Sequence, residues 1–127
     1  MFKIINLKGS IAMSYKITKA NEAYTYEAPL HYDCRATRLH DPQDVNEGKI
    51  INGLSHFLPG GGIEKAANPN ESIYVVLEGE MTITIDGTDH KLCKGDSIHF
   101  GPFTERSAKN TGMVSAQMMA IILPPQS

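Results

Sequence analysis

Hydrophobic and polar residues alternate over short stretches along most of this 127-residue chain. The clearest stretch is Met-Thr-Ile-Thr-Ile at residues 81–85, in which the apolar side chains would share one face of a strand and the threonines the other. Residues 73–77 are apolar at every position, which is typical of a strand covered on both faces. Asp86-Gly87 comes next after the alternating stretch, and both residues tolerate positive φ, so a two-residue β-hairpin turn is predicted there.

The pattern elsewhere predicts further short strands separated by turns. Runs with β-branched or aromatic members predict strands at residues 15–17, 34–39, 50–58, 90–93, 97–100 and 115–123. Segments rich in glycine, proline or polar residues predict loops or turns at 41–48, 59–62 and 68–70. Because long helical periodicity is absent, the chain is predicted to be all-β, a single antiparallel sandwich or barrel.

The overall charge and the apolar runs narrow the possible partners. A net charge of −2, from 12 Lys+Arg against 14 Asp+Glu, with no basic block, argues against nucleic acid or a membrane surface as the partner. The longest apolar run, residues 118–123, is far shorter than the about 20 residues that span a bilayer. Residues 1–12 lack the apolar region of a signal peptide, and Met13 is an alternative start. We therefore expect a cytoplasmic protein whose Cys34 and Cys93 are buried thiols, not a disulfide.

Two motifs in the middle of the chain carry a family resemblance. The first is Pro-Gly-Gly-Gly at 59–62 together with residues 74–80, and the second is residues 92–100 followed by Asn110. In this arrangement residues 58–110 resemble a cupin, a small jelly-roll β-barrel of the RmlC-like type. The framework positions of that family fall on Gly60, Gly79, Gly95, Asp96 and Asn110.

The resemblance implies a domain organisation and a way of assembling. Residues 31–127 would form the antiparallel jelly-roll β-barrel, and residues 1–30 an N-terminal arm with the first edge strand. Small cupins commonly pair through a sheet face or by exchanging edge strands, and covering an open edge is a physical incentive to do so. A homodimer is therefore expected.

The resemblance also implies a metal site of three histidines and a glutamate, but this sequence departs from it. The family's ligand positions fall on Ala66, Asn68, Ser72 and Arg106. A guanidinium at a ligand position repels a divalent metal and cannot be deprotonated. No cofactor is therefore expected. A divalent metal (Fe, Mn, Ni or Zn) stays an alternative, with unorthodox ligands drawn from His56, His99, Glu64 and Glu71.

The replaced ligand positions predict a polar pocket instead. Arg106 offers a planar fork that matches a carboxylate or phosphate, and Ser72, Asn68 and Tyr74 would add hydroxyl or amide contacts. The alternative is structural, with Arg106 paired to Glu105, Glu71 or Glu64 and filling the space that a metal would take.

Three functions follow from these residues. The first is a small-molecule-binding protein that holds a polar or carboxylate-bearing metabolite in the barrel. The second is a catabolic enzyme, an isomerase, decarboxylase or lyase, in which Glu71, His56 or Tyr74 moves a proton. The third is a metal enzyme with unorthodox ligands, such as a dioxygenase. Composition and spacing do not choose among them.

Overall fold

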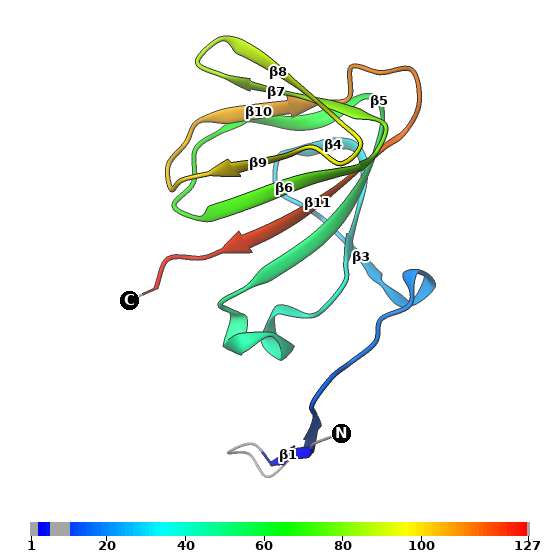
Figure 1. Ribbon diagram of the computed structural model, residues 1–127, viewed down its shortest axis with the longest axis vertical. Helices are drawn as coiled ribbons and strands as arrows, with labels where there is room; N and C mark the ends of the chain where they lie inside the picture. The colour runs from blue at the N-terminus through cyan, green and yellow to red at the C-terminus, as the bar shows by residue number, and fades with distance from the viewer. Residues whose placement is uncertain (1–2, 6–10, 127) are drawn as a thin grey trace.

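The computed structural model describes residues 3–5 and 11–126, which form an all-β molecule with three short 3-10 turns (Figure 1). β1 (Lys3–Ile5) and β2 (Ile11–Met13) make a separate antiparallel pair. The other strands form one nine-stranded sheet. They are β3 (Tyr24–Tyr26), β4 (His31–Arg38), β5 (Ile51–Ala66), β6 (Glu71–Glu78), β7 (Glu80–Ile85), β8 (Thr88–Cys93), β9 (Ser97–Phe100), β10 (Arg106–Lys109) and β11 (Ala116–Leu123).

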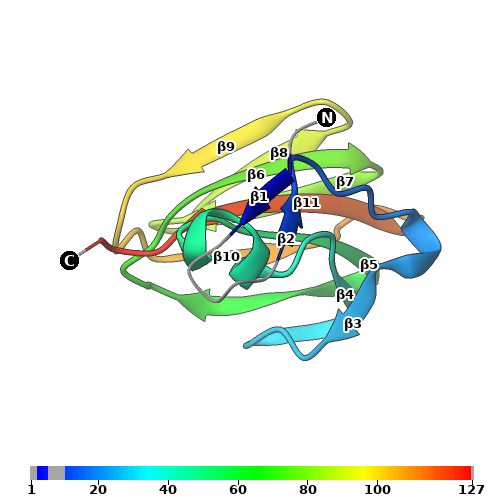
Figure 2. The same ribbon diagram turned by 90° about the horizontal axis from the view of Figure 1, so that it is seen from below.

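The sheet closes nearly into a barrel. Its strand order is β8-β7-β10-β5-β11-β6-β9, with β4 beside β5 and β3 beside β4, and all these pairs are antiparallel. Seen at right angles to the first view, the strands wrap around one interior (Figure 2). The predicted hairpin is confirmed, because Asp86 and Gly87 both have positive φ, 51° and 74°, between β7 and β8. The prediction of an antiparallel jelly-roll barrel is likewise confirmed.

The 16-residue strand β5 belongs to both layers of the barrel. Its first half pairs with β11, and its second half, from Gly62 onward, pairs with β10. The turn predicted at residues 59–62 is therefore wrong, since this glycine-rich segment lies inside the strand, with only Gly60 in the left-handed region. The glycines are needed because a Cβ on Gly61 would collide with the Asp33 carbonyl oxygen, and one on Gly62 with that of Ala108.

The barrel interior is filled by apolar side chains that alternate inward along the strands. Tyr74 is its least apolar member. The buried core consists of Phe57, Tyr74, Val76, Met81, Ile83, Phe100, Ala108, Ala116 and Met118.

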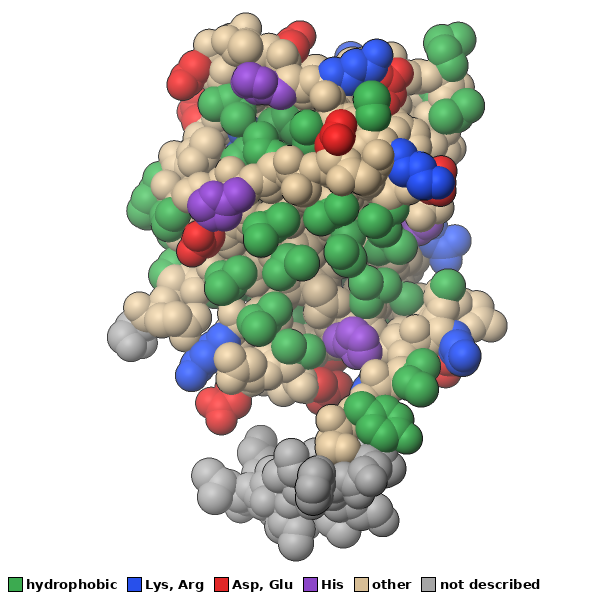
Figure 3. Space-filling model, viewed as in Figure 1, with side chains coloured by type: hydrophobic (Ala, Val, Ile, Leu, Met, Phe, Trp, Pro, Cys, Tyr) green, Lys and Arg blue, Asp and Glu red, His purple; other side chains and the backbone are tan. Residues whose placement is uncertain are grey.

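The outer face of β6 and β11 is also apolar. Alternation turns Ile73 and Val75 of β6, and Met119 and Ile121 of β11, away from the interior. Figure 3 shows hydrophobic side chains gathered over these two strands, with histidine and charged side chains around them. This explains why residues 73–77 are apolar without alternation. The expected homodimer stays a prediction.

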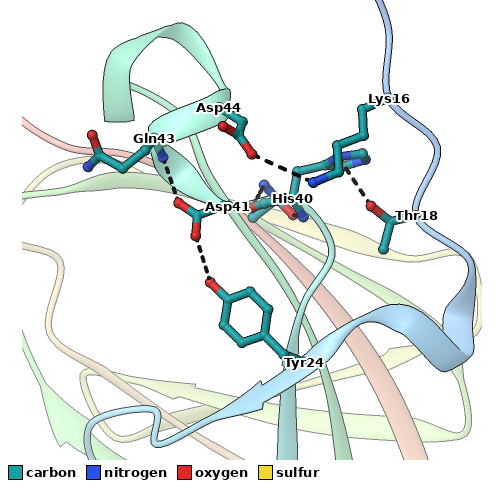
Figure 4. A network of polar contacts seen from close by, with 8 residues as sticks. Lys16, Thr18, Tyr24, His40, Asp41, Gln43 and Asp44 are labelled. Atoms are coloured by element: carbon teal, nitrogen blue, oxygen red, sulfur yellow. Dashed lines mark hydrogen bonds and ion pairs between the residues drawn. The ribbon is translucent and has the colours of Figure 1, made fainter. Parts of the chain in front are cut away.

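The segment before β3 connects the β1–β2 pair to the barrel (Figure 1). The strand predicted at residues 15–17 is wrong, because these residues form no β-bridge, and Tyr15 and Ile17 are exposed. Within it, Nζ of Lys16 lies 3.7 Å from an oxygen of Asp44, and both side chains are exposed (Figure 4). It leads through the 3-10 turn η1 (Ala20–Glu22) into β3, which pairs with β4.

The polar loop predicted at 41–48 contains two 3-10 turns, η2 (Pro42–Asp44) and η3 (Asn46–Gly48). The Asp41 side chain organises it, accepting hydrogen bonds from the Gln43 amide at 2.9 Å and from the Tyr24 hydroxyl at 3.3 Å (Figure 4). The loop therefore joins the end of β4 to the start of β5 and is tied to β3.

Two further findings concern the cysteines and membranes. Cys34 and Cys93 are free thiols, but Cys34 is half-buried and Cys93 exposed, so the prediction of two buried thiols is wrong. Within the described ranges, no helix is long and apolar enough to cross a bilayer.

Candidate functional site

A buried arginine at the start of β10 is the centre of the site. Arg106 is 8% exposed and reaches across the interior to β6. One terminal nitrogen, Nη1, donates to the Thr104 carbonyl at 3.0 Å. The other, Nη2, donates to the Ser72 hydroxyl at 3.4 Å and to the Tyr74 hydroxyl at 3.2 Å. The structure thus brings together three of the four predicted ligand-binding residues.

Two aromatic rings flank this guanidinium. Its Cζ lies 4.5 Å from the centroid of the Phe100 ring and 5.7 Å from that of Tyr74. The two rings meet edge to face, with centroids 5.0 Å apart. Ser72 pairs with Phe100 across β6 and β9, so the register holds both strands against the cation. A cation over aromatic faces is stabilised by their quadrupoles, more so where water is excluded.

The positive charge of Arg106 has no anionic partner among the described residues. Of the acids proposed to pair with it, Glu105 pairs with Lys65 at 3.2 Å, and Glu71 pairs with His99 at 2.6 Å. The structural alternative, in which Arg106 is neutralised by a glutamate, is therefore wrong. A buried cation that contacts neutral groups alone is costly to desolvate, and it makes the surrounding interior attractive to an anion.

A second group of polar residues lies at the same end of the barrel and was missed by the sequence analysis. The Tyr26 hydroxyl and Nη1 of Arg38 both lie close to Gly53. A Cβ atom at that position would be 2.8 Å from the hydroxyl and 3.8 Å from Nη1. The Arg38 guanidinium stacks 3.9 Å from the Tyr26 ring centroid and donates to the Asn52 carbonyl at 2.8 Å. Burial raises the pKa of Tyr26, and the nearby Arg38 charge opposes that rise. The Tyr-Thr-Tyr alternation of residues 24–26 is the signal that could have revealed this strand.

Asn68, the fourth predicted ligand-binding residue, has a local role. Its side-chain oxygen accepts a hydrogen bond from the Asn70 amide at 3.0 Å, and its carbonyl oxygen accepts one from the Phe103 amide at 2.7 Å. Asn68 therefore organises the turn between β5 and β6 and links it to the loop before β10.

The acid–base candidates Glu71 and His56 lie away from Arg106. Glu71 and His99 form a hydrogen bond between exposed positions of β6 and β9. His56 faces outward from β5, opposite Arg35, beside a cavity of about 420 Å³ on that side of the strand. Of the three catalytic candidates, Tyr74 alone contacts the arginine.

Comparison with known proteins identifies the family. The model of the cupin domain matches residues 53–122, which is more than half of the chain. This chain belongs to the cupin family. A protein named β-D-galactosidase from Mycobacterium tuberculosis is 34% identical over 110 residues, covering 87% of this chain and 95% of that protein.

Solved cupin-like structures share the fold. A predicted oxalate decarboxylase from Thermotoga maritima superimposes with a TM-score of 0.74 at 17% identity, covering 87% of this chain and 100% of that one. The polyketide cyclase RemF from Streptomyces resistomycificus gives a TM-score of 0.76 at 14% identity, covering 87% of this chain and 80% of that one. At such identities the likeness concerns the fold alone.

Cupins often bind metals, but the residues at the family's ligand positions in this chain do not suit a metal ion. Two of the family's ligand positions, Arg106 and Ser72, lie in contact, and a guanidinium has no lone pair to give to an ion. The unorthodox ligands proposed above, His56, His99, Glu64 and Glu71, do not come together in one site. Among the described residues, no group of three His, Cys, Asp or Glu could hold a metal ion.

A smaller cavity, about 220 Å³, lies under β3 and β4 and is lined by Tyr26, His31 and Cys34 among others. His31 stacks on Phe57 with ring centroids 5.9 Å apart, and its Nδ1 lies 2.8 Å from the Pro29 carbonyl oxygen. Burial lowers the pKa of His31, more than the Pro29 hydrogen bond raises it. Burial also raises the pKa of the Cys34 thiol, which keeps it neutral and poorly nucleophilic.

The lowered pKa of His31 predicts a pH-dependent stability. Because the unfolded chain binds a proton at His31 more readily than the native barrel does, stability is fully present above the ordinary histidine pKa and falls as the pH drops below it. Between pH 7.5 and 5.5, we expect the melting temperature of His31→Phe, which keeps the aromatic contact with Phe57, to fall less than that of the wild type. His90→Gln, at an exposed position of β8, is the control and should behave as the wild type. Equal losses in the wild type and His31→Phe would contradict this assignment.

Proposed function

We propose that this cupin binds a small carboxylate through Arg106 inside the barrel. The observation that carries the proposal is a buried guanidinium whose hydrogen-bond partners, Ser72, Tyr74 and Thr104, are all neutral. A carboxylate would supply the missing negative charge and accept hydrogen bonds from the N–H groups of the guanidinium that Ser72, Tyr74 and Thr104 leave free.

The neighbours of Arg106 would orient such a ligand. The Ser72 and Tyr74 hydroxyls accept hydrogen bonds from Nη2, so the proton of each hydroxyl is left to donate to an anionic oxygen. Phe100, 1% exposed, keeps water from that side of the cation. Charge-assisted bonds formed away from water are stronger than those at a surface.

A catalytic role is the second candidate, and Tyr74 is the residue that favours it. Its hydroxyl lies 3.2 Å from Nη2 of Arg106, within reach of a carboxylate held there. In an isomerase, decarboxylase or lyase, Arg106 would hold the acid and Tyr74 would carry the proton. The relative named β-D-galactosidase suggests a sugar instead. Glycoside hydrolysis ordinarily uses a pair of carboxylates, whereas the groups that contact Arg106 are a carbonyl oxygen and two hydroxyls.

Replacing Arg106 by methionine tests the binding function. We expect the melting temperature of wild-type protein to rise with at least one member of a panel of sodium mono- and dicarboxylates, and Arg106→Met to lose that rise. Affinity measured by calorimetry should fall at least about 100-fold, as for removal of one partner of a buried charge pair. Without ligand, Arg106→Met should be as stable as the wild type or more so, because an unpaired buried cation is replaced by an apolar side chain.

Arg35→Met is the matched control, since Arg35 is an exposed arginine on the outward side of β4. A carboxylate response that survives in Arg106→Met would refute the proposal. So would a panel that leaves the wild type unchanged. Hydrolysis of p-nitrophenyl β-D-galactoside by the wild type, together with no response to any acid, would favour the sugar.

A further inference from the structure

A second arginine at the same end of the barrel also has no anionic partner. Arg38 is half-buried, and its described contacts are the Tyr26 ring and the Asn52 carbonyl oxygen. No carboxylate among the described residues forms an ion pair with it. Arg38 therefore resembles Arg106 in being a cation held by an aromatic ring and a carbonyl oxygen.

The strand register places the two arginines on opposite sides of one interior region. Tyr74 of β6 pairs with Ala120 of β11, which pairs with Gly53 of β5, so these three residues form one inward row across the sheet. Arg106 contacts the Tyr74 end of that row, and Arg38 lies beside the Gly53 end. Neighbouring strands are about 4.8 Å apart, so the two ends of the row are separated by about 10 Å.

The residues between the two cations are aromatic or small. Tyr26 extends its hydroxyl over Gly53, where any side chain would collide with it, and Tyr74 lies at the other end of the row. The region thus offers a positive charge at each end, with rings and hydroxyl groups between.

We propose that the ligand of this cupin is a small dicarboxylate, with one carboxylate on Arg106 and the other on Arg38. The inference rests on the proposed function, because it presumes that Arg106 binds an acid. Two like cations without internal counter-charges repel each other and are both neutralised by one dianion of matching length. A monocarboxylate would leave Arg38 unpaired. The aromatic rings would contact the carbon chain between the two ends.

Calorimetry on the full chain tests this class of ligand. The probes are succinate and glutarate, each compared with the monoacid of the same carbon number, butyrate and valerate. We expect at least one dicarboxylate to bind the wild type about 10-fold or more tightly than its monoacid. Arg38→Gln should remove that preference and leave monoacid affinity within about 2-fold of the wild type. Arg35→Gln, on the outward side of the same strand, should keep the preference.

Arg38→Lys provides a second variant, since it keeps the charge while losing the planar fork. It should retain part of the preference that Arg38→Gln loses. Dicarboxylates that bind the wild type no more tightly than monoacids overturn the inference, and so does a preference that survives in Arg38→Gln. If either result is found and monoacids still bind in a way that depends on Arg106, the proposed carboxylate binding holds and only the dicarboxylate inference fails. If no acid binds the wild type, both fall.

Discussion

Gly62→Ala is expected to lower the free energy of unfolding by about 3–5 kcal/mol, or to prevent folding. Gly62 lies where β5 passes between Tyr32 of β4 and Lys109 of β10. A Cβ there would collide with the Ala108 carbonyl oxygen, which is backbone and cannot move aside without parting β10 from β5. Urea denaturation followed by far-ultraviolet circular dichroism measures the loss, since the chain has no tryptophan.

Gly101→Ala is the matched control for this substitution. A Cβ on Gly101 would find no atom within 4 Å, and its φ lies outside the left-handed region. Its unfolding free energy should stay within about 0.5 kcal/mol of the wild type. A Gly62→Ala protein as stable as Gly101→Ala would show that close backbone packing does not require glycine in β5.

Asn110→Ala is expected to cost about 3 kcal/mol, because it leaves several buried polar groups unpaired. Asn110 is 1% exposed. Its side-chain nitrogen donates to the carbonyls of Phe57 at 3.1 Å and Val114 at 2.8 Å, and its oxygen accepts from the Gly112 amide at 2.9 Å. This one side chain therefore joins β5 to the loop between β10 and β11, and thermal melts should show a correspondingly lower transition.

Asn110→Asp sharpens the test, because it keeps the volume but replaces the donor by a second oxygen. That oxygen would face the two carbonyl oxygens of Phe57 and Val114, so the aspartate variant should be no more stable than the alanine variant. Met113→Ala, in the same loop and 93% exposed, is the control and should change stability by less than about 0.5 kcal/mol. Wild-type stability in Asn110→Asp would rule out the hydrogen bonds as the cause.

Alternation predicted the strands whose inward residues are apolar, and it failed where they are not. β7 was found because its inward residues are Met81 and Ile83. β10 was missed because the side chains it turns inward are an arginine and Ala108, so no hydrophobic signal marks it. Local sequence predicts a turn in the glycine-rich part of β5, because it does not reveal that two neighbouring backbones approach closely there.

The site was predictable only in part for a similar reason. The positions of Ser72 and Arg106 came from the resemblance to cupins, and Tyr74 from its spacing to Ser72 on one strand. Arg38 could not be placed, because its position depends on the register of β4 against β5. That register shifts at Asp33, a non-glycine residue with a φ of 49°, which sequence reasoning does not anticipate.

The path of β5 also bears on how the chain reaches its fold. Its first residues pair with partners about seventy positions later, as Ile51 does with Ile122, and its last residues with partners about forty-five later, as Ile63 does with Ala108. Such distant pairing makes folding slow, because loop closure must precede the contacts that reward it. During synthesis, one side of β5 stays unpaired until β11 has left the ribosome. During that interval the unpaired edge of β5 is exposed and can pair with other chains, so this is the state in which the protein would need a chaperone.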